Sequence, residues 1–231
     1  GADHLTIETA AWLAEFHEQL AELAADRNIT LVLMGGNAAA LRMEASKQRG
    51  SRDNDYLTDA TGEDIEALMA ALADRFAPLA PLFEPRPHTP EDAAPLPLRT
   101  YHIPVPTLYA KTRDARHTIK VEFHVGIDQL PPAETIASPH FALPAPVRAT
   151  VPKLPYQVSL KLLTLADPPV GLAAARESVL PRQVYDLDSL MEQMSEAQAF
   201  AEAHTYAEAL YVKECQVHAV TPQDGEPWAG I

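Results

Sequence analysis

The pattern of apolar and polar positions predicts alternating helices and short strands in the first third of the chain. Residues 8–26 carry apolar side chains at helical spacing with acidic residues between them, which predicts an amphipathic helix. A β-branched apolar run at 29–34 predicts a buried strand, and the helix formers at 37–44 predict a helix directly after it. A second strand at 51–58 and a helix at 63–75 follow.

Proline dominates the middle of the chain, where residues 78–106 contain nine prolines. Because proline fixes φ and lacks an N–H donor, this tract is expected to be a loop with edge strands at most. The candidates are 101–103 and 107–109. Residues 118–125 alternate cleanly and predict a strand, whereas a second proline-rich stretch at 131–155 is expected to form a loop.

From residue 156 onward the pattern is helical, at 156–166, at about 175–194 and at 196–219. The sequence therefore predicts an α/β (α+β) fold class. We expect a core over residues 1–150 and a mostly helical part over 151–231.

Composition narrows the class of protein. The chain has 231 residues, of which 47% are hydrophobic, and a net charge of −14, which argues against generic coating of nucleic acid. Its single cysteine, Cys215, excludes an internal disulfide. No apolar run approaches the roughly 20 residues that span a bilayer, and the first residues lack a basic signal-peptide region. We therefore expect a cytoplasmic protein without membrane contact.

Two short motifs can carry chemistry. Gly35 and Gly36 stand between a predicted strand and a predicted helix, where they form either a tight turn or a close approach to a phosphate. Asp53 and Asp55 are two residues apart on a predicted strand, so their carboxylates share one face. They form either a solvated acidic turn or a site for Mg²⁺, which prefers oxygen ligands.

Together these motifs resemble a known family. The order strand, Gly-Gly, helix, Asp-x-Asp is similar to the polymerase β-like nucleotidyltransferase superfamily. More closely, the segment resembles the AbiEii-type, MenT-like nucleotidyltransferase toxins, which typically show Gly-Gly or Gly-Ser, a short helix and then Arg-x-Ser/Thr-x-Asp-x-Asp. The matching positions are Gly35, Gly36, Arg49, Ser51, Asp53 and Asp55, whereas Asn54 stands where the family usually has an apolar residue. The resemblance implies a nucleotidyltransferase core with a mixed sheet.

A second region matches the same family. The toxin family similarly carries a lysine in a helix, followed by Arg-Asp-x-x-Asp-Leu. Here Lys161 lies in an apolar predicted helix, and Arg182 and Asp186 follow about twenty residues later at the matching positions. Gln183 departs from the pattern, which has aspartate there. Without the resemblance, the lysine would extend its ammonium to solvent and the other two would form a helix pair. The resemblance implies instead that Lys161 neutralises the charge of a nucleotide phosphate and that Asp186 orients the lysine. Residues 151–231 would then complete the active site.

Glu122 is a possible third carboxylate. It lies on the polar face of the strand at 118–125, beside Lys120 and His124. Nucleotidyltransferases often add such a carboxylate from a neighbouring strand, so Glu122 is either a metal ligand or a solvent-facing charge.

The resemblance implies a mechanism and partners. It implies two-metal transfer of a nucleoside monophosphate from an NTP, with Asp53, Asp55 and Glu122 as metal ligands. Gly35, Gly36, Ser51, Arg52 and Arg182 would bind the nucleotide, and Asp53, Asp55, Lys161 and Asp186 would be catalytic. It further implies a tRNA 3′ end as acceptor and a cognate antitoxin. A small-molecule acceptor such as an aminoglycoside, a protein hydroxyl, or a non-catalytic binding module are the alternatives.

Basic residues cluster in two segments despite the acidic balance. If the acceptor is RNA, they should converge on one rim of the cleft; otherwise they lie in solvated loops. The two clusters are Arg42, Lys47, Arg49 and Arg52, and Lys111, Arg113, Arg116 and Lys120.

Overall fold

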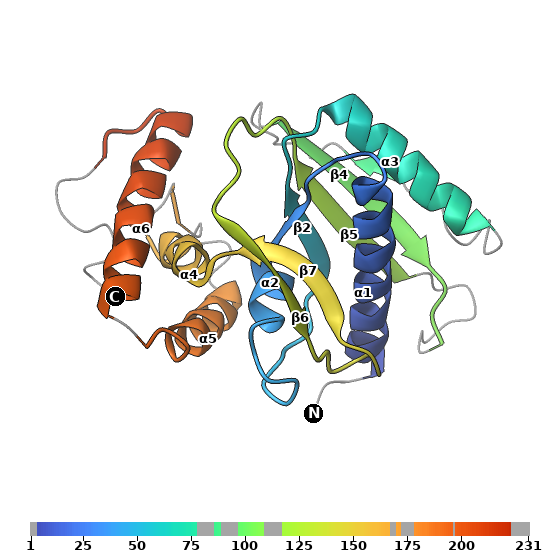
Figure 1. Cartoon of the computed structure of the whole chain (residues 1–231), viewed down its shortest axis with the longest axis horizontal. Helices are drawn as coiled ribbons and strands as arrows, with labels where there is room; N and C mark the ends of the chain where they lie inside the picture. The colour runs from blue at the N-terminus through green and yellow to red at the C-terminus, as the bar shows by residue number, and fades with distance from the viewer. Residues whose placement is uncertain are drawn as a thin grey trace. The chain divides into compact units, whose positions relative to one another are not determined.

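The computed structural model describes residues 4–77, 86–88, 97–108, 117–166, 170–171, 178–195 and 197–222 (Figure 1). The chain divides into two compact units, Gly1–Val151 and Pro152–Ile231. In the described residues, no helix is long and apolar enough to cross a membrane.

The first unit is built on a mixed five-stranded sheet. The strands lie in the order β1 (Val32–Met34), β2 (Asp53–Leu57), β5 (His117–His124), β4 (Leu98–Val105) and β3 (Arg86–His88). Strands β2 and β5 run parallel, and the other neighbours are antiparallel. The mixed α/β class predicted from the pattern is confirmed.

Two helices, α1 (His4–Ala25) and α3 (Gly62–Arg75), pack against each other beside this sheet (Figure 1). The α1 ring of His17 stacks on Tyr56 of β2, which in turn stacks on Phe123 of β5. The α3 helix begins at a capping box in which Thr61 and Asp64 bond reciprocally. These contacts place the main hydrophobic core between the two helices and one face of the sheet.

The strict alternation of β2 decides which side chains face the core. Tyr56 is fully buried, and Asn54 is 1% exposed, whereas Asp53 and Asp55 point to the opposite face. Asn54 donates to the Leu13 carbonyl of α1 at 2.9 Å and accepts from Asn37 at 2.6 Å. A polar residue is therefore tolerated at this buried position because its amide is hydrogen-bonded.

The expectation that residues 78–106 supply only edge strands is wrong for β4, which pairs with both β3 and β5. Its proline, Pro104, pairs with Thr118 of β5 and lies beyond the three β4 residues that pair with β3. The missing N–H therefore leaves the three-residue ladder with β3 intact. The other predicted edge strand, at 107–109, is not present at residues 107–108, and residue 109 lies outside the described residues.

The second proline-rich stretch is also not simply a loop. It contains β6 (Ala133–Ser138) and β7 (Val147–Pro152), which form a two-stranded sheet. Most of its prolines flank these strands rather than interrupt them, and Pro152 is the last residue of β7. Strand β7 contributes Val147, Ala149 and Val151 to the main core.

The second unit consists of three helices, α4 (Leu154–Leu163), α5 (Leu180–Met191) and α6 (Ala197–Val217). Helix α4 packs against both α5 and α6, and the Tyr156 ring of α4 lies 5.2 Å from that of Tyr206 in α6. Helix α5 starts at Leu180, later than the predicted residue 175, and Pro181 stands in its first turn, where no N–H donor is needed.

Candidate active site

Three carboxylates gather on the face of the sheet opposite the core. Asp55 of β2 is paired in register with Glu122 of β5, and Asp53 precedes Asp55 by two residues. One oxygen from each side chain lies within 4.8 Å of the others, a spacing that can hold a metal ion. We call Asp53, Asp55 and Glu122 the acidic triad; the expectation that the two aspartates share a face is confirmed.

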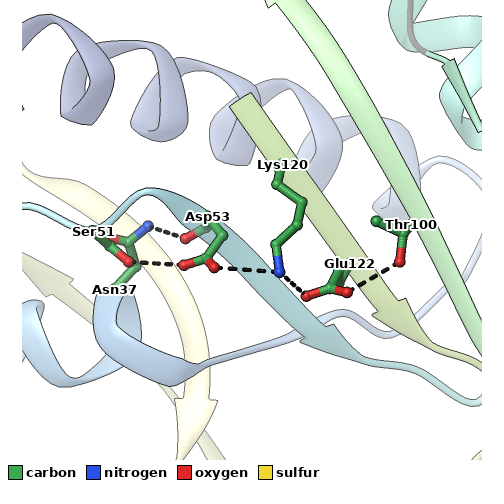
Figure 2. A network of polar contacts seen from close by, with 6 residues as sticks. All are labelled: Asn37, Ser51, Asp53, Thr100, Lys120 and Glu122. Atoms are coloured by element: carbon green, nitrogen blue, oxygen red, sulfur yellow. Dashed lines mark hydrogen bonds and ion pairs between the residues drawn. The ribbon is translucent and has the colours of Figure 1, made fainter. Parts of the chain in front are cut away.

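An ammonium group lies inside this cluster. The register pairs Asp53 with Lys120, so the Lys120 Nζ reaches both strands. It lies 3.5 Å from Oδ2 of Asp53 and donates a hydrogen bond to Oε2 of Glu122. The Thr100 hydroxyl of β4 donates to the other Glu122 oxygen at 3.0 Å, as Figure 2 shows.

The electrostatics of the cluster differ from group to group. Burial, reinforced by the charges of Asp53 and Glu122, raises the pKa of Asp55 to about 7 despite the nearby Lys120. Burial would raise the pKa of Glu122 as well, but the hydrogen bond and charge of Lys120 outweigh it, so that this pKa is lowered. Lys120 compensates its neighbours in part, and the triad retains an excess of negative charge.

The double glycine lies directly against the triad. Gly35 begins the short helix α2 (Gly35–Ala40) with φ +67°, a conformation that side chains rarely adopt. A Cβ atom on Gly35 would stand 2.5 Å from Oδ2 of Asp55. A Cβ on Gly36 would stand 3.0 Å from the Arg49 guanidinium and 3.2 Å from the Ser51 hydroxyl. Both the positive φ and the close approach to Asp55 therefore favour glycine at position 35, whereas a side chain at position 36 would require Arg49 and Ser51 to shift slightly.

Hydrogen bonds fix the start of β2 against α2. The Asn37 amide of α2 donates to the Asp53 carbonyl at 3.0 Å, and the Ser51 hydroxyl donates to Oδ1 of Asp53 at 3.1 Å (Figure 2). The glycine turn and the carboxylates are thus positioned by one polar network.

The triad fits a hard divalent cation. Its donors are carboxylate oxygens from two adjacent strands, the ligand type that Mg²⁺ prefers. Burial first, and the neighbouring carboxylates second, raise the pKa of Asp55, and a bound cation would stabilise the ionised form that both effects disfavour.

The second unit contains a buried ion pair. The Nζ of Lys161 in α4 donates to Asp186 and to Gln183 of α5, both at 2.8 Å. The Lys161 side chain is 7% exposed and that of Asp186 is fully buried, so the lysine does not extend to solvent. Arg182 is exposed on the same helix. Gln183, which departs from the family pattern, therefore acts with Asp186 to hold the Lys161 ammonium in place.

The basic clusters are placed only in part. Arg42 pairs with Glu134 of β6 at 2.7 Å, and Arg52 is exposed. Lys120 belongs to the acidic triad's network rather than to a basic rim. The remaining members of its cluster lie outside the described residues: Lys111, Arg113 and Arg116.

Sequence reasoning missed the contacts that cross between strands. The alternation of 118–125 places Lys120 on the same strand face as Glu122, but from the sequence Lys120 is assigned only to a basic cluster for RNA, and Thr100 and Asn37 are given no role. The pairing with Asp53 depends on register, which the sequence does not reveal.

Comparisons with known proteins identify the family and the fold of the chain. A family model described as "Nucleotidyl transferase AbiEii toxin, Type IV TA system" matches residues 20–224. An antigenic nucleotidyltransferase-like protein from Paracoccidioides brasiliensis is similar in structure, with a TM-score of 0.54 and 14% identity over 91% of this chain and 92% of that chain. The antibiotic-resistance factor ANT(2'')-Ia gives a TM-score of 0.50 and 12% identity, over 91% and 97%.

No curated protein matches the chain in sequence. At such low identity the two structures show the fold alone, which is that of nucleotidyltransferases. The family model covers most of the chain and confirms the resemblance stated from the motifs. The chain therefore belongs to the AbiEii nucleotidyltransferase toxin family, and the protein is a nucleotidyltransferase.

Proposed function

We propose that the protein transfers a nucleoside monophosphate from an NTP to the 3′ end of tRNA in a Mg²⁺-dependent reaction and so blocks translation. The observation that carries the catalytic part is the acidic triad beside the Gly35-Gly36 turn. The acceptor oxygen attacks the α-phosphorus, the bond from the α-phosphorus to the bridging oxygen breaks, and pyrophosphate leaves.

The acidic triad would hold the metal, which when bound supplies positive charge to the phosphates. Because Gly35 has no side chain, the backbone of the glycine turn lies directly against the Asp55 carboxylate, and a polyphosphate bound beside this carboxylate would be close to the backbone N–H groups of the turn. Arg49 and Ser51 stand next to Gly36 and are donors suited to phosphate oxygens. Arg52, exposed just before Asp53, is a further candidate for phosphate contact.

We assign the second unit, residues 151–231 as bounded from the sequence, to completing this site. Asp186 and Gln183 hold the Lys161 ammonium in one place, a suitable arrangement for neutralising phosphate charge. Arg182 is exposed on the same helix and would contribute to nucleotide binding. The type IV toxin–antitoxin family also implies a cognate antitoxin that restrains the activity in the cytoplasm.

A small-molecule or protein hydroxyl is the second candidate acceptor. The observation that favours it is that Arg42 and Lys120, two of the basic residues expected to attract RNA, are engaged with Glu134 and Glu122. The net charge of −14 adds to this argument.

Incubation with each α-labelled NTP, Mg²⁺ and total RNA tests the acceptor. We expect label at the 3′ end of tRNA, and no label when the RNA is oxidised with periodate before the reaction, because that treatment destroys the terminal 3′ hydroxyl. Label on a small molecule or on protein instead would support the second candidate, and no transfer to any acceptor would contradict both.

A further inference from the structure

An ammonium group bridges two of the three proposed metal ligands. Lys120 Nζ contacts Glu122 of its own strand and lies 3.5 Å from Asp53 of the neighbouring strand. Figure 2 shows the lysine side chain reaching across to the space between these carboxylates. A metal ion that ligates both carboxylates would therefore lie close to this ammonium and compete with it for their negative charge.

The fold fixes the lysine in this place. Lys120 is the register partner of Asp53 in the parallel pair β2–β5, and it lies on the same strand face as Glu122. Thr100 holds the far oxygen of Glu122, while Ser51 holds one oxygen of Asp53. Both acceptors are thus oriented by neighbours, and the ammonium has a preformed position between them.

Charge balance limits how many cations fit. When all three carboxylates are ionised, as ligands of a metal ion are, they carry −3, and Lys120 supplies +1, which leaves −2 in the cluster. One divalent ion neutralises this remainder, whereas two would leave the cluster at +2 before a nucleotide binds. Like charges at such short range repel strongly in a half-buried site.

We propose that Lys120 is a tethered cation that takes the place of one of the two divalent ions, so that the acidic triad holds a single divalent ion. This inference rests on the proposed metal-dependent function. It replaces the two-metal site expected from the family resemblance with one metal ion and one lysine.

Counting bound Mn²⁺ tests this directly, because free Mn²⁺ gives an electron paramagnetic resonance signal that is lost on binding. The full chain would be titrated as the wild type and as the variants Lys120→Met, which keeps the aliphatic stem, and Lys120→Arg, which keeps the charge. Arg27→Met is the matched control. Arg27 is exposed at the end of α1, which packs on the core face of the sheet, away from the triad.

We expect one Mn²⁺ per chain in the wild type, in Lys120→Arg and in Arg27→Met. In Lys120→Met the first ion should bind at least tenfold more tightly, and a second should bind, because the competing charge is gone. Two ions in the wild type would overturn the inference, as would unchanged number and affinity in Lys120→Met. If Lys120→Met does not fold, Lys120→Gln replaces it, and the wild-type count still decides.

The same titration distinguishes failure of the proposed metal-dependent function from failure of the role assigned to Lys120. Absence of Mn²⁺ binding by the wild type and by every Lys120 variant would remove the metal site itself. A wild-type count of two would leave the metal-dependent function standing and overturn only the role of Lys120.

Discussion

At the scale of single residues, Gly35 is the position where backbone conformation and site geometry meet. Alanine there must adopt φ +67° and place its Cβ 2.5 Å from an Asp55 oxygen. Gly126 has nearly the same φ, +66°, but a Cβ there meets nothing within 4 Å. The two glycines therefore separate backbone strain from displacement of the carboxylate.

We expect Gly126→Ala to lose about 1–2 kcal/mol of stability, because it forces a left-handed conformation on alanine, and Gly35→Ala to lose at least as much, because its Cβ also displaces the Asp55 carboxylate. Only Gly35→Ala should lose nucleotidyl transfer, by tenfold or more. Urea unfolding and the label-transfer rate measure the two effects. Equal activity in both variants would mean that the close approach of Gly35 to Asp55 has no catalytic importance.

The Lys161–Asp186 pair requires a variant that removes charge without breaking the fold. Lys161→Met alone leaves Asp186 buried without its main counter-charge, which should cost about 3–5 kcal/mol. The double variant Lys161→Met/Asp186→Leu should recover most of this stability, since apolar replacements of a buried pair are often neutral. If Lys161 contacts phosphate, transfer stays abolished in both variants.

Chemical denaturation together with the transfer assay distinguishes the roles of this pair. A stable double variant with full activity would show that the pair is only structural.

At the scale of secondary structure, His17 ties α1 to two sheets. Its ring contacts the Tyr56 hydroxyl of β2 at 3.0 Å and the Arg148 carbonyl of β7 at 3.1 Å. Burial lowers the pKa of His17 below its usual value of 6.5, although the hydrogen bond to Arg148 opposes the shift. The folded state therefore binds this proton less readily than the unfolded state.

The sign of the pH effect follows by linkage. The contribution of neutral His17 to the free energy of unfolding is fully present above about pH 6.5. It is lost as the pH falls through the pKa of His17 in the folded state, and the free energy of unfolding then falls by up to about 1.4 kcal/mol per pH unit. We expect the wild type to lose more stability between pH 7 and pH 5.5 than His17→Gln does. Urea unfolding at both pH values measures this, and parallel losses would contradict it.

The elements illustrate what a sequence pattern can predict. Alternation predicted β5 and the shared face of Asp53 and Asp55, because a period of two fixes the face locally. Proline content misled the prediction for β4 and β7, because these strands tolerate proline beyond a short ladder or at their last residue. The role of Lys120 could not be predicted, since it depends on the register between β2 and β5.

At the scale of the whole molecule, the net charge of −14 makes the acceptor an electrostatic question. Transfer to tRNA must depend on local positive charge, so we expect its apparent affinity to fall steeply between 50 and 200 mM salt. The slope of log affinity against log salt should be about −0.7 per phosphate contacted for a single-stranded end. Affinity that does not change with salt, in protein shown to remain folded, would favour a small acceptor.

The most direct test of the central claim compares α-labelled with γ-labelled NTP. The account predicts that label reaches the acceptor only from the α-phosphate, with one pyrophosphate released per transfer. It also predicts that Asp53→Asn abolishes transfer, whereas Asp59→Asn, at an exposed aspartate just beyond β2, leaves it unchanged. Label arriving from the γ-phosphate, or full transfer by Asp53→Asn, would contradict nucleotidyl transfer at the acidic triad.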